Sequence, residues 1–366
     1  MKNKMQWVLA AALVCGTVFF ASCTQDGDTI YQPDPKDQAE NKPLVTVIYD
    51  PNALGDRGYN DLIFEGIESA AREYGLRTMQ LSPTTVKEGL TYIESLIQTV
   101  IAAEDSVRRL IVVAAGSYDD YLRKNNSRLD SVPYTDLLYL ETSTPLEGKG
   151  STLNIPYYGA MYEAGVITPL LSTDVLLVGA NNKAKRITNA VEGFTEGFQS
   201  SPITGKALTE KKLVTAWLSD EVSGGFTVSD TTALQLMCSQ EWNGYDHLIV
   251  PVCGGSASSF RRICEMLSTY DYVGVDCEVV SSRCNFSVVK RIDRAVYECV
   301  EQWLSPEGMP KHQTHGLADG YTEVVIHPFS KDFFNFSKDS FDKLLSDSLR
   351  QAIHEEAIRK EDGHDQ

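Results

Sequence analysis

From residue 43 onward, short apolar segments alternate with segments in which apolar residues recur every three or four positions. Short apolar runs such as 44–50 and 110–115 are typical of buried strands. Between them, residues 62–74 place Ile63, Ile67 and Ala70 on one face of a helix. The same pattern predicts further strands at 76–81, 136–141, 175–179, 213–218, 247–252, 272–276 and 321–327. It predicts further helices at 87–103, 157–170, 184–198, 228–241, 258–267, 288–304 and 339 to about 358.

Strands and helices that alternate at this spacing build parallel sheets with helices on both faces. So many strands would strain one compact sheet, and the length suits two domains of roughly 120–150 residues each. We therefore expect an α/β fold of two Rossmann-like lobes with a hinged cleft between them, where ligands would meet the carboxyl ends of the strands. The first lobe covers 43–150, completed by about 283–315. The second covers 151–282, completed by about 316–366, and its polar tail from 361 should be frayed.

The N-terminus has the features of a bacterial lipoprotein signal peptide, which we assign to residues 1–22. Lys2 and Lys4 precede a mostly apolar stretch, 8–21. This stretch is shorter than a membrane-spanning helix, which needs about 20 apolar residues. Small residues lead directly to Cys23, the expected site of lipid modification. An ordinary signal peptide cut near Ala21, leaving a plain thiol, is the alternative.

Residues 23–42 form a polar segment with two prolines and no apolar period, which predicts a disordered tether. A lipid on Cys23 would hold the mature protein at a bilayer surface without crossing it. Because Thr24 is not an aspartate of the inner-membrane retention type, we expect an outer-membrane lipoprotein on the periplasmic or cell-surface side.

The charge balance excludes one class of partner. The chain has a net charge of −17, and loss of residues 1–22, with two lysines and no acidic residue, makes it −19. Nucleic acids and anionic membrane surfaces attract clustered lysine and arginine, so neither is an expected partner.

The cysteine pattern leaves two interpretations open. Six cysteines remain after Cys23, an even number that permits disulfides in an oxidising compartment. Buried free thiols that act as small hydrophobic side chains explain the pattern equally well. The six are Cys238, Cys253, Cys264, Cys277, Cys284 and Cys299.

Enzyme signatures are weak, and we expect no enzymatic activity, no catalytic residue, no metal and no cofactor. His312 and His315 form an H-x-x-H without the glutamate or the spacing of a zinc-protease helix, so loop histidines are expected. The segment 254–258 (GGSAS) lies between a strand and a helix but lacks the closing glycine of a nucleophile elbow. Its glycines favour close approach of the backbone to a ligand.

Several motifs, in order, resemble the basic membrane protein family, the substrate-binding lipoproteins of nucleoside ABC transporters. They are 56–60 (DRGYN), 154–165 (NIPYYGAMYEAG), 176–179 (LLVG), 193–198 (GFTEGF), 253–255 (CGG), 274–276 (GVD) and 287–293 (SVVKRID). The resemblance covers about residues 43–305 and implies a type 1 periplasmic-binding fold, a purine nucleoside ligand and an ABC permease partner. Gly58, Tyr59 and the pair Cys277-Glu278 depart from the family pattern.

The resemblance implies a set of ligand contacts. An aromatic face for the base would come from Tyr59, with Trp217 as a looser match. Polar partners of the base would be Asp50 and Asn60. The ribose hydroxyls would be held by one carboxylate, since it accepts from two hydroxyl groups. The ribose contacts would be Asp276 and Lys290. Glu141, where the family tends to have an aspartate, is a weaker candidate for a ligand contact.

Each of these residues also has a structural interpretation. Asn60 suits a helix cap, and Lys290 with Asp276 suits a structural ion pair. Two other functions remain open: a sensor or binder of another small polar metabolite such as a sugar, and a nucleoside-cleaving enzyme.

Overall fold

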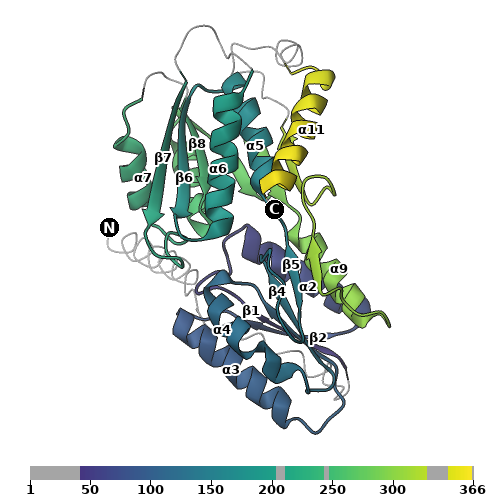
Figure 1. Cartoon of the computed structure of the whole chain (residues 1–366). Helices are drawn as coiled ribbons and strands as arrows, with labels where there is room; N and C mark the ends of the chain where they lie inside the picture. Colours follow the sequence, from purple (N-terminus) through teal and green to yellow (C-terminus); the bar gives the residue numbers. More distant parts are fainter. Residues whose placement is uncertain (1–41, 203–210, 243–246, 328–344, 365–366) are drawn as a thin grey trace, which may run out of the picture. The chain divides into compact units, whose positions relative to one another are not determined.

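The computed structural model describes residues 42–202, 211–242, 247–327 and 345–364. The signal peptide, Cys23 and the tether lie outside these residues. Two six-stranded sheets, each flanked by helices, form two lobes (Figure 1). The expected α/β fold of two lobes with parallel sheets is confirmed.

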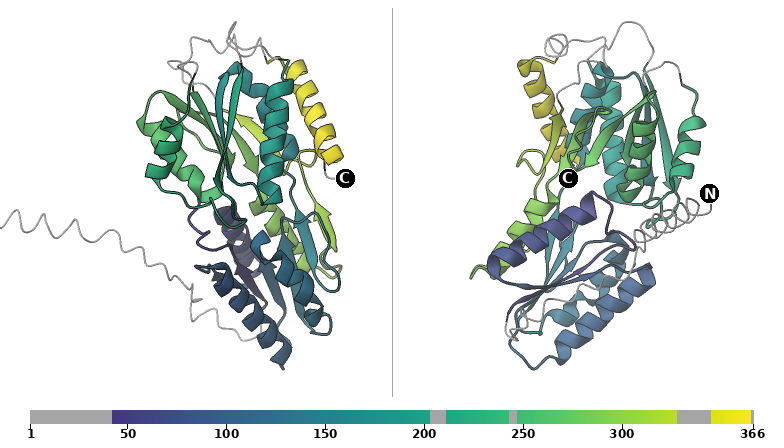
Figure 2. Two further views of the ribbon diagram at one scale, coloured as in Figure 1. Left: turned by 60° about the vertical axis from the view of Figure 1, so that its left-hand side comes forward. Right: turned by 180° about the vertical axis from the view of Figure 1, so that it is seen from behind.

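The first lobe is built on a wholly parallel sheet with the order β11-β5-β4-β3-β1-β2. Its strands are β1 (Leu44–Ile48), β2 (Arg77–Leu81), β3 (Arg109–Val113), β4 (Thr135–Leu140), β5 (Ser151–Asn154) and β11 (His312–Thr314). One face packs against α2 (Tyr59–Tyr74) and α9 (Ile292–Leu304). The other packs against α3 (Val86–Ala102) and α4 (Asp119–Asn125), as the views of Figure 2 show.

The second lobe has the order β12-β10-β9-β8-β6-β7, in which β12 alone is antiparallel to its neighbour. Its strands are β6 (Asp174–Asn181), β7 (Lys212–Ser219), β8 (His247–Val252), β9 (Tyr270–Asp276), β10 (Cys284–Lys290) and β12 (Thr322–Ile326). Its helices are α5 (Tyr158–Ile167), α6 (Lys185–Ser200), α7 (Asp230–Cys238), α8 (Ala257–Met266) and α11 (Asp347–His364). Helices α5, α6 and α11 lie side by side (Figure 1).

The chain crosses between the sheets three times: between β5 and α5, between β10 and α9, and between β11 and β12. Two boundaries therefore differ from the expectation. Strand β5 still belongs to the first sheet, and β10 pairs with β9 in the second, so the return to the first lobe occurs after Lys290 rather than near residue 283.

The predicted helix over 288–304 is wrong at its start, because 284–290 form strand β10 and the helix begins at Ile292. Every residue of β10 is buried, and a strand covered on both faces shows no alternation that would separate it from the helix that follows. Strands β5 and β11, of four and three residues, were not predicted.

The tail is more ordered than its polarity indicates, because α11 continues to His364. Glu361 is 5% exposed, and its carboxylate accepts the N–H groups of Gly159 and Leu317, both at 2.8 Å. The start of the predicted helix, 339–344, lies outside the described residues.

All six cysteines after Cys23 are free in the structure, and Cys253, Cys264, Cys284 and Cys299 are buried. Burial raises the pKa of the Cys284 and Cys299 thiols to about 12, so these groups stay protonated. The structure thus favours the interpretation as small hydrophobic side chains. Across the residues that the structure covers, no helix is long and apolar enough to span a bilayer.

Candidate ligand-binding site

Four of the residues expected to bind ligand lie at the carboxyl ends of strands. Asp50 lies two residues after β1, Glu141 directly follows β4, and Asp276 and Lys290 end β9 and β10. Glu141 and Asp276 have φ angles of 61° and 70°, in the left-handed region that residues with a side chain seldom adopt. Backbone strain of this kind is concentrated at binding and active sites.

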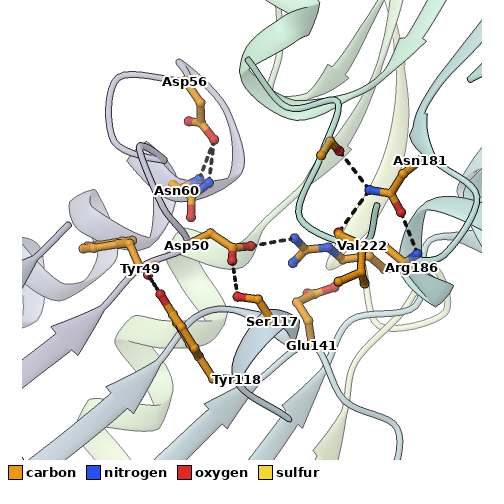
Figure 3. Close-up of polar contacts among 12 residues, drawn as sticks. Tyr49, Asp50, Asp56, Asn60, Ser117, Tyr118, Glu141, Asn181, Arg186 and Val222 are labelled. Atoms are coloured by element: carbon orange, nitrogen blue, oxygen red, sulfur yellow. Dashed lines mark hydrogen bonds and ion pairs between the residues drawn. The ribbon is translucent and has the colours of Figure 1, made fainter. Parts of the chain in front are cut away.

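The loop before α2 is organised by Asp56. Its carboxylate accepts the N–H groups of Gly58, at 2.9 Å, and Asn60, at 3.0 Å. It also accepts the side-chain amide of Asn60 at 2.8 Å, which fixes the orientation of that amide (Figure 3). The capping role considered for Asn60 therefore belongs to Asp56, and the Oδ1 of Asn60 is left for another partner.

A buried ion pair connects the ends of the two sheets. The Nζ of Lys290 donates to the Oε2 of Glu141 at 2.9 Å, and the side chains are 5% and 3% exposed. The same ammonium lies 4.9 Å from the ring centre of Tyr157 and 5.8 Å from that of Tyr59. Lys290 is thus paired with Glu141, not with Asp276, the partner considered from the sequence.

Asp276 faces the first lobe without an ion-pair partner among the described residues. A Cβ built on Gly58 would lie 3.6 Å from the Asp276 Cβ, so the two backbones approach closely. The backbone N–H of Asp276 donates to the Tyr157 hydroxyl at 3.0 Å. Burial raises the pKa of the Asp276 carboxyl to about 6, against an opposing effect of Lys290. A cavity of about 20 Å³ lies beside Asp276 and Gly58, enough for about one water molecule.

Arg186, which was not among the predicted site residues, reaches this cluster from the first turn of α6. One guanidinium nitrogen lies 3.4 Å from the carboxylate of Asp50, which also accepts the Ser117 hydroxyl (Figure 3). The guanidinium carbon lies 5.2 Å from the ring centre of Tyr59 and 5.8 Å from that of Phe226. The cation therefore lies against two aromatic rings, one from each lobe.

Asn181, the last residue of β6, holds Arg186 and Phe226 in place. Its Oδ1 accepts the N–H groups of Lys183 and Ala184, at 3.1 and 2.7 Å, at the start of α6. Its Nδ2 donates to the carbonyls of Val222 and Gly224, at 3.1 and 3.0 Å, in the loop that leads to Phe226 (Figure 3). A single buried amide thus sets the geometry of two walls of the site.

Four buried side-chain atoms around this cluster have no hydrogen-bond partner among the described residues. They are the hydroxyl of Tyr59, Oδ1 of Asn60, Oε1 of Glu141 and Nη1 of Arg186. A buried polar atom without a partner costs about 1–3 kcal/mol, so such atoms are rare and are seldom gathered in one place. Burial, followed by the nearby charge of Glu141, also raises the pKa of Tyr59, which keeps its hydroxyl protonated and able to donate.

Trp217 does not lie with the other residues predicted to bind ligand. It lies on β7 in register with Gly179 of β6, and a Cβ built on that glycine would be 2.2 Å from the indole ring. The ring packs against the hydrophobic core of the second lobe. Phe226, another aromatic residue of the second lobe, does lie in the cluster, against Arg186.

The other motifs have structural partners. The hydroxyl of Ser256 accepts the Val228 N–H and donates to the Gly225 carbonyl, both at 2.8 Å. A Cβ on Gly255 would lie 2.9 Å from the Phe226 carbonyl, so this glycine lets the Phe226 loop approach. The Nδ1 of His312 lies 2.7 Å from the Thr152 hydroxyl. Across the described ranges, no three His, Cys, Asp or Glu side chains are placed to hold a metal ion.

Comparison with known proteins identifies the architecture. No sequence family matches the chain, and no curated protein matches it. An ABC transporter solute-binding protein of Aeropyrum pernix K1 superposes with a TM-score of 0.63 at 15% identity, covering 88% of this chain and 90% of that one. A transcriptional activator of the comK gene from Bacillus halodurans superposes with a TM-score of 0.60 at 14% identity, covering 85% and 97%.

A glucose-galactose binding protein, GanP of Geobacillus stearothermophilus, superposes with a TM-score of 0.52 at 15% identity, covering 78% of this chain and 97% of that one. At these identities the likeness establishes the fold. The chain has the type 1 periplasmic-binding architecture of two α/β lobes, as the family resemblance implied. The specific resemblance to purine nucleoside binders has no counterpart among these matches.

Proposed function

We propose that this protein is a solute-binding protein that encloses a small polar molecule where its two lobes meet. The observation that carries the proposal is the set of four unpartnered buried atoms of Tyr59, Asn60, Glu141 and Arg186. A ligand that supplies their hydrogen bonds recovers a desolvation cost that the protein alone bears. The same architecture in ABC transporter solute-binding proteins supports this function and an ABC permease as partner.

The two ion pairs suit a closed arrangement of the lobes. Glu141 with Lys290, and Asp50 with Arg186, each join a residue of the first lobe to one of the second. Closure of hinged lobes excludes water and strengthens the electrostatic interactions inside the cleft. Each pair would thus favour closure once a ligand occupies the site.

A purine nucleoside is the first ligand to test. The family resemblance assigned Tyr59, Asn60, Asp276 and Lys290 to base and ribose. In support, Lys290 lies 5.8 Å from the ring centre of Tyr59, and a Cβ on the neighbouring Gly58 would lie 3.6 Å from that of Asp276. The carboxylate of Asp276 suits two vicinal hydroxyls of a ribose. The location of Trp217 in the second-lobe core removes one of the two aromatic contacts expected for the base.

A sugar or polyol is the second candidate, favoured by the polarity of the unpartnered atoms. Glu141 and Asn60 offer acceptors, Arg186 offers a donor, and the Tyr59 hydroxyl is both. Hydroxyl groups, which donate and accept, satisfy such a mixed set. Two neighbours of the same fold are a glucose-galactose binding protein and a protein of Agrobacterium vitis with bound allitol.

Lipid anchoring through Cys23 completes the proposal. It would keep the protein at the surface of a membrane, which we propose to be the outer membrane, with the lobes free to meet a solute on its periplasmic or outer side. The residues that carry this part are those of the signal peptide and Thr24.

Native mass spectrometry of the purified protein tests for a retained solute, and calorimetry tests the candidates. We expect heat from at least one of guanosine, inosine, adenosine, D-ribose, D-glucose and D-galactose. For a bound nucleoside or sugar, Asp276→Ala should weaken binding about ten- to a hundredfold, the range for a hydrogen bond to a charged group. No retained solute and no heat with folded wild-type protein would contradict the proposal for these ligand classes.

A further inference from the structure

Arg186 lies against the ring of Tyr59, the aromatic face on which the base of a nucleoside was expected to stack. The aromatic faces available there are those of Tyr59, from the first lobe, and Phe226, from the second, and the guanidinium lies 5.2 and 5.8 Å from their ring centres. A guanidinium is itself planar and stacks on aromatic rings. The protein thus covers these faces with its own side chain.

This arginine is also held in place. Asp50 accepts from one guanidinium nitrogen at 3.4 Å, and Asn181 fixes the turn that begins α6. The other terminal nitrogen, Nη1, is buried without a partner. A structural arginine would be expected to satisfy both terminal nitrogens, since a buried donor of a charged group is costly to leave unpaired.

Two of the other unpartnered atoms of the site are acceptors. Oε1 of Glu141 and Oδ1 of Asn60 are buried and unpartnered. Arg186 and Lys290 are each paired with one carboxylate, and Asp276 forms no ion pair among the described residues. A ligand here must donate several hydrogen bonds and accept one from Arg186, and it needs no negative charge.

We propose that Arg186 is the residue that determines specificity in this cleft. Its Nη1 donates to a hydroxyl oxygen of the ligand, and its guanidinium keeps an aromatic base from stacking between Tyr59 and Phe226. The ligand is therefore recognised through the hydroxyl groups of a neutral polyhydroxylated ring, either a free sugar or the ribose of a nucleoside. This inference rests on the proposed solute-binding function.

Calorimetry on wild-type protein, Arg186→Met and Arg186→Lys tests it, with D-ribose, D-glucose, D-galactose, inosine and hypoxanthine as probes. Wild-type protein should bind at least one hydroxyl-bearing probe and should not bind hypoxanthine. Arg186→Met should weaken binding of the hydroxyl-bearing probe at least tenfold. It should also raise the affinity for hypoxanthine relative to the affinity for that probe. Arg186→Lys, which keeps the charge but not the planar fork, should not restore binding fully.

Lys185→Met is the matched control, because Lys185 is the exposed neighbour on the same helix and should leave all affinities unchanged. If Arg186→Met fails to fold with Asp50 unpaired, the double variant Asp50→Asn, Arg186→Met removes that charge and is compared with Asp50→Asn alone. A general loss of structure would weaken all probes together, whereas a specificity role changes the ratio between inosine and hypoxanthine.

These measurements separate failure of the role proposed for Arg186 from failure of the proposed solute-binding function. If wild-type protein binds a sugar or nucleoside and Arg186→Met binds it equally well, the role of Arg186 is overturned and the proposed function stands. Wild-type binding of hypoxanthine as tightly as inosine would overturn it as well. No heat from any probe with folded wild-type protein would overturn this inference, and together with no retained solute it would also contradict the proposed function for these ligand classes.

Discussion

At the scale of single residues, Asp276 combines a left-handed backbone with a buried carboxyl whose pKa is raised to about 6 by burial. The unfolded chain releases this proton near pH 4, so the folded protein binds more protons between pH 4 and 6. The carboxylate therefore lowers the free energy of unfolding as the pH rises through this window. Because the Asp276 carboxylate destabilises the folded protein, a role in binding a ligand explains this residue better than a role in stability.

Asp276→Asn should raise the free energy of unfolding of the ligand-free protein at pH 7 by about 1–3 kcal/mol, since a pKa shift of one unit corresponds to about 1.4 kcal/mol. Asparagine tolerates the left-handed backbone, so the loop is retained. Urea unfolding between pH 4 and 7.5 measures the effect, which should vanish towards pH 4. The exposed Asp220→Asn is the control. Equal stability of Asp276→Asn and wild type at pH 7 would contradict the argument.

Lys290 and Glu141 form the most buried ion pair of the cleft. Lys290→Met leaves a buried carboxylate unpaired and should destabilise the protein by about 3–5 kcal/mol. Adding Glu141→Gln should recover much of the loss. Arg294→Met, in the exposed pair with Glu298, should cost less than about 1 kcal/mol. Denaturant unfolding of wild type, Lys290→Met, Glu141→Gln and the double variant gives the coupling. A Lys290→Met effect no larger than that of Arg294→Met would exclude a buried pair.

The sequence indicates some of these residues but not how they are partnered. Asp50, Glu141, Asp276 and Lys290 could be found because each ends or follows an apolar strand, and parallel strands end on the same side of a sheet. Arg186 could not, because an arginine in an amphipathic helix has the same pattern as one on a solvated face.

At the scale of elements, the long strands and helices follow from periodicity, whereas β5, β10 and β11 do not. Three or four residues carry too little pattern, and β10 merges with the apolar face of α9. The position of α11 also depends on contacts that no pattern reports. Its Glu361 binds Gly159, in the first turn of α5 just after one crossing segment, and Leu317, within another.

Glu361→Ala would leave two buried N–H groups without their acceptor, and each costs about 1–3 kcal/mol. We expect a loss of several kcal/mol in the free energy of unfolding and faster hydrogen exchange at Gly159 and Leu317. Glu361→Gln, which keeps one acceptor oxygen, should lose less. The exposed Glu355→Ala on the same helix should change neither. Unchanged exchange at both amides in Glu361→Ala would show that α11 does not restrain the crossing segments.

At the scale of the whole molecule, two lobes were predictable because strands and helices alternate over more residues than one sheet accommodates. The sequence did not predict which strand returns to which lobe. The crossings at 155–157, 291 and 315–321 are short segments without a pattern of their own. The net charge of −17 gives the molecule no attraction of its own to anionic bilayers. We propose that lipid chains on Cys23 provide any stable attachment to a membrane.

Cys23→Ser tests that conclusion. If lipid chains on Cys23 supply nearly all of the bilayer affinity, the variant should leave the membrane fraction as an uncleaved or released protein, because the remaining chain supplies no comparable anchor. Cys238→Ser, which changes an exposed free thiol in the second lobe, should fractionate like wild type. Detergent-phase partitioning separates the two variants, and mass spectrometry of the wild-type N-terminus reports the acyl chains directly. A Cys23→Ser protein that still enters the detergent phase after processing at residue 22 would mean that the anchor lies elsewhere in the chain.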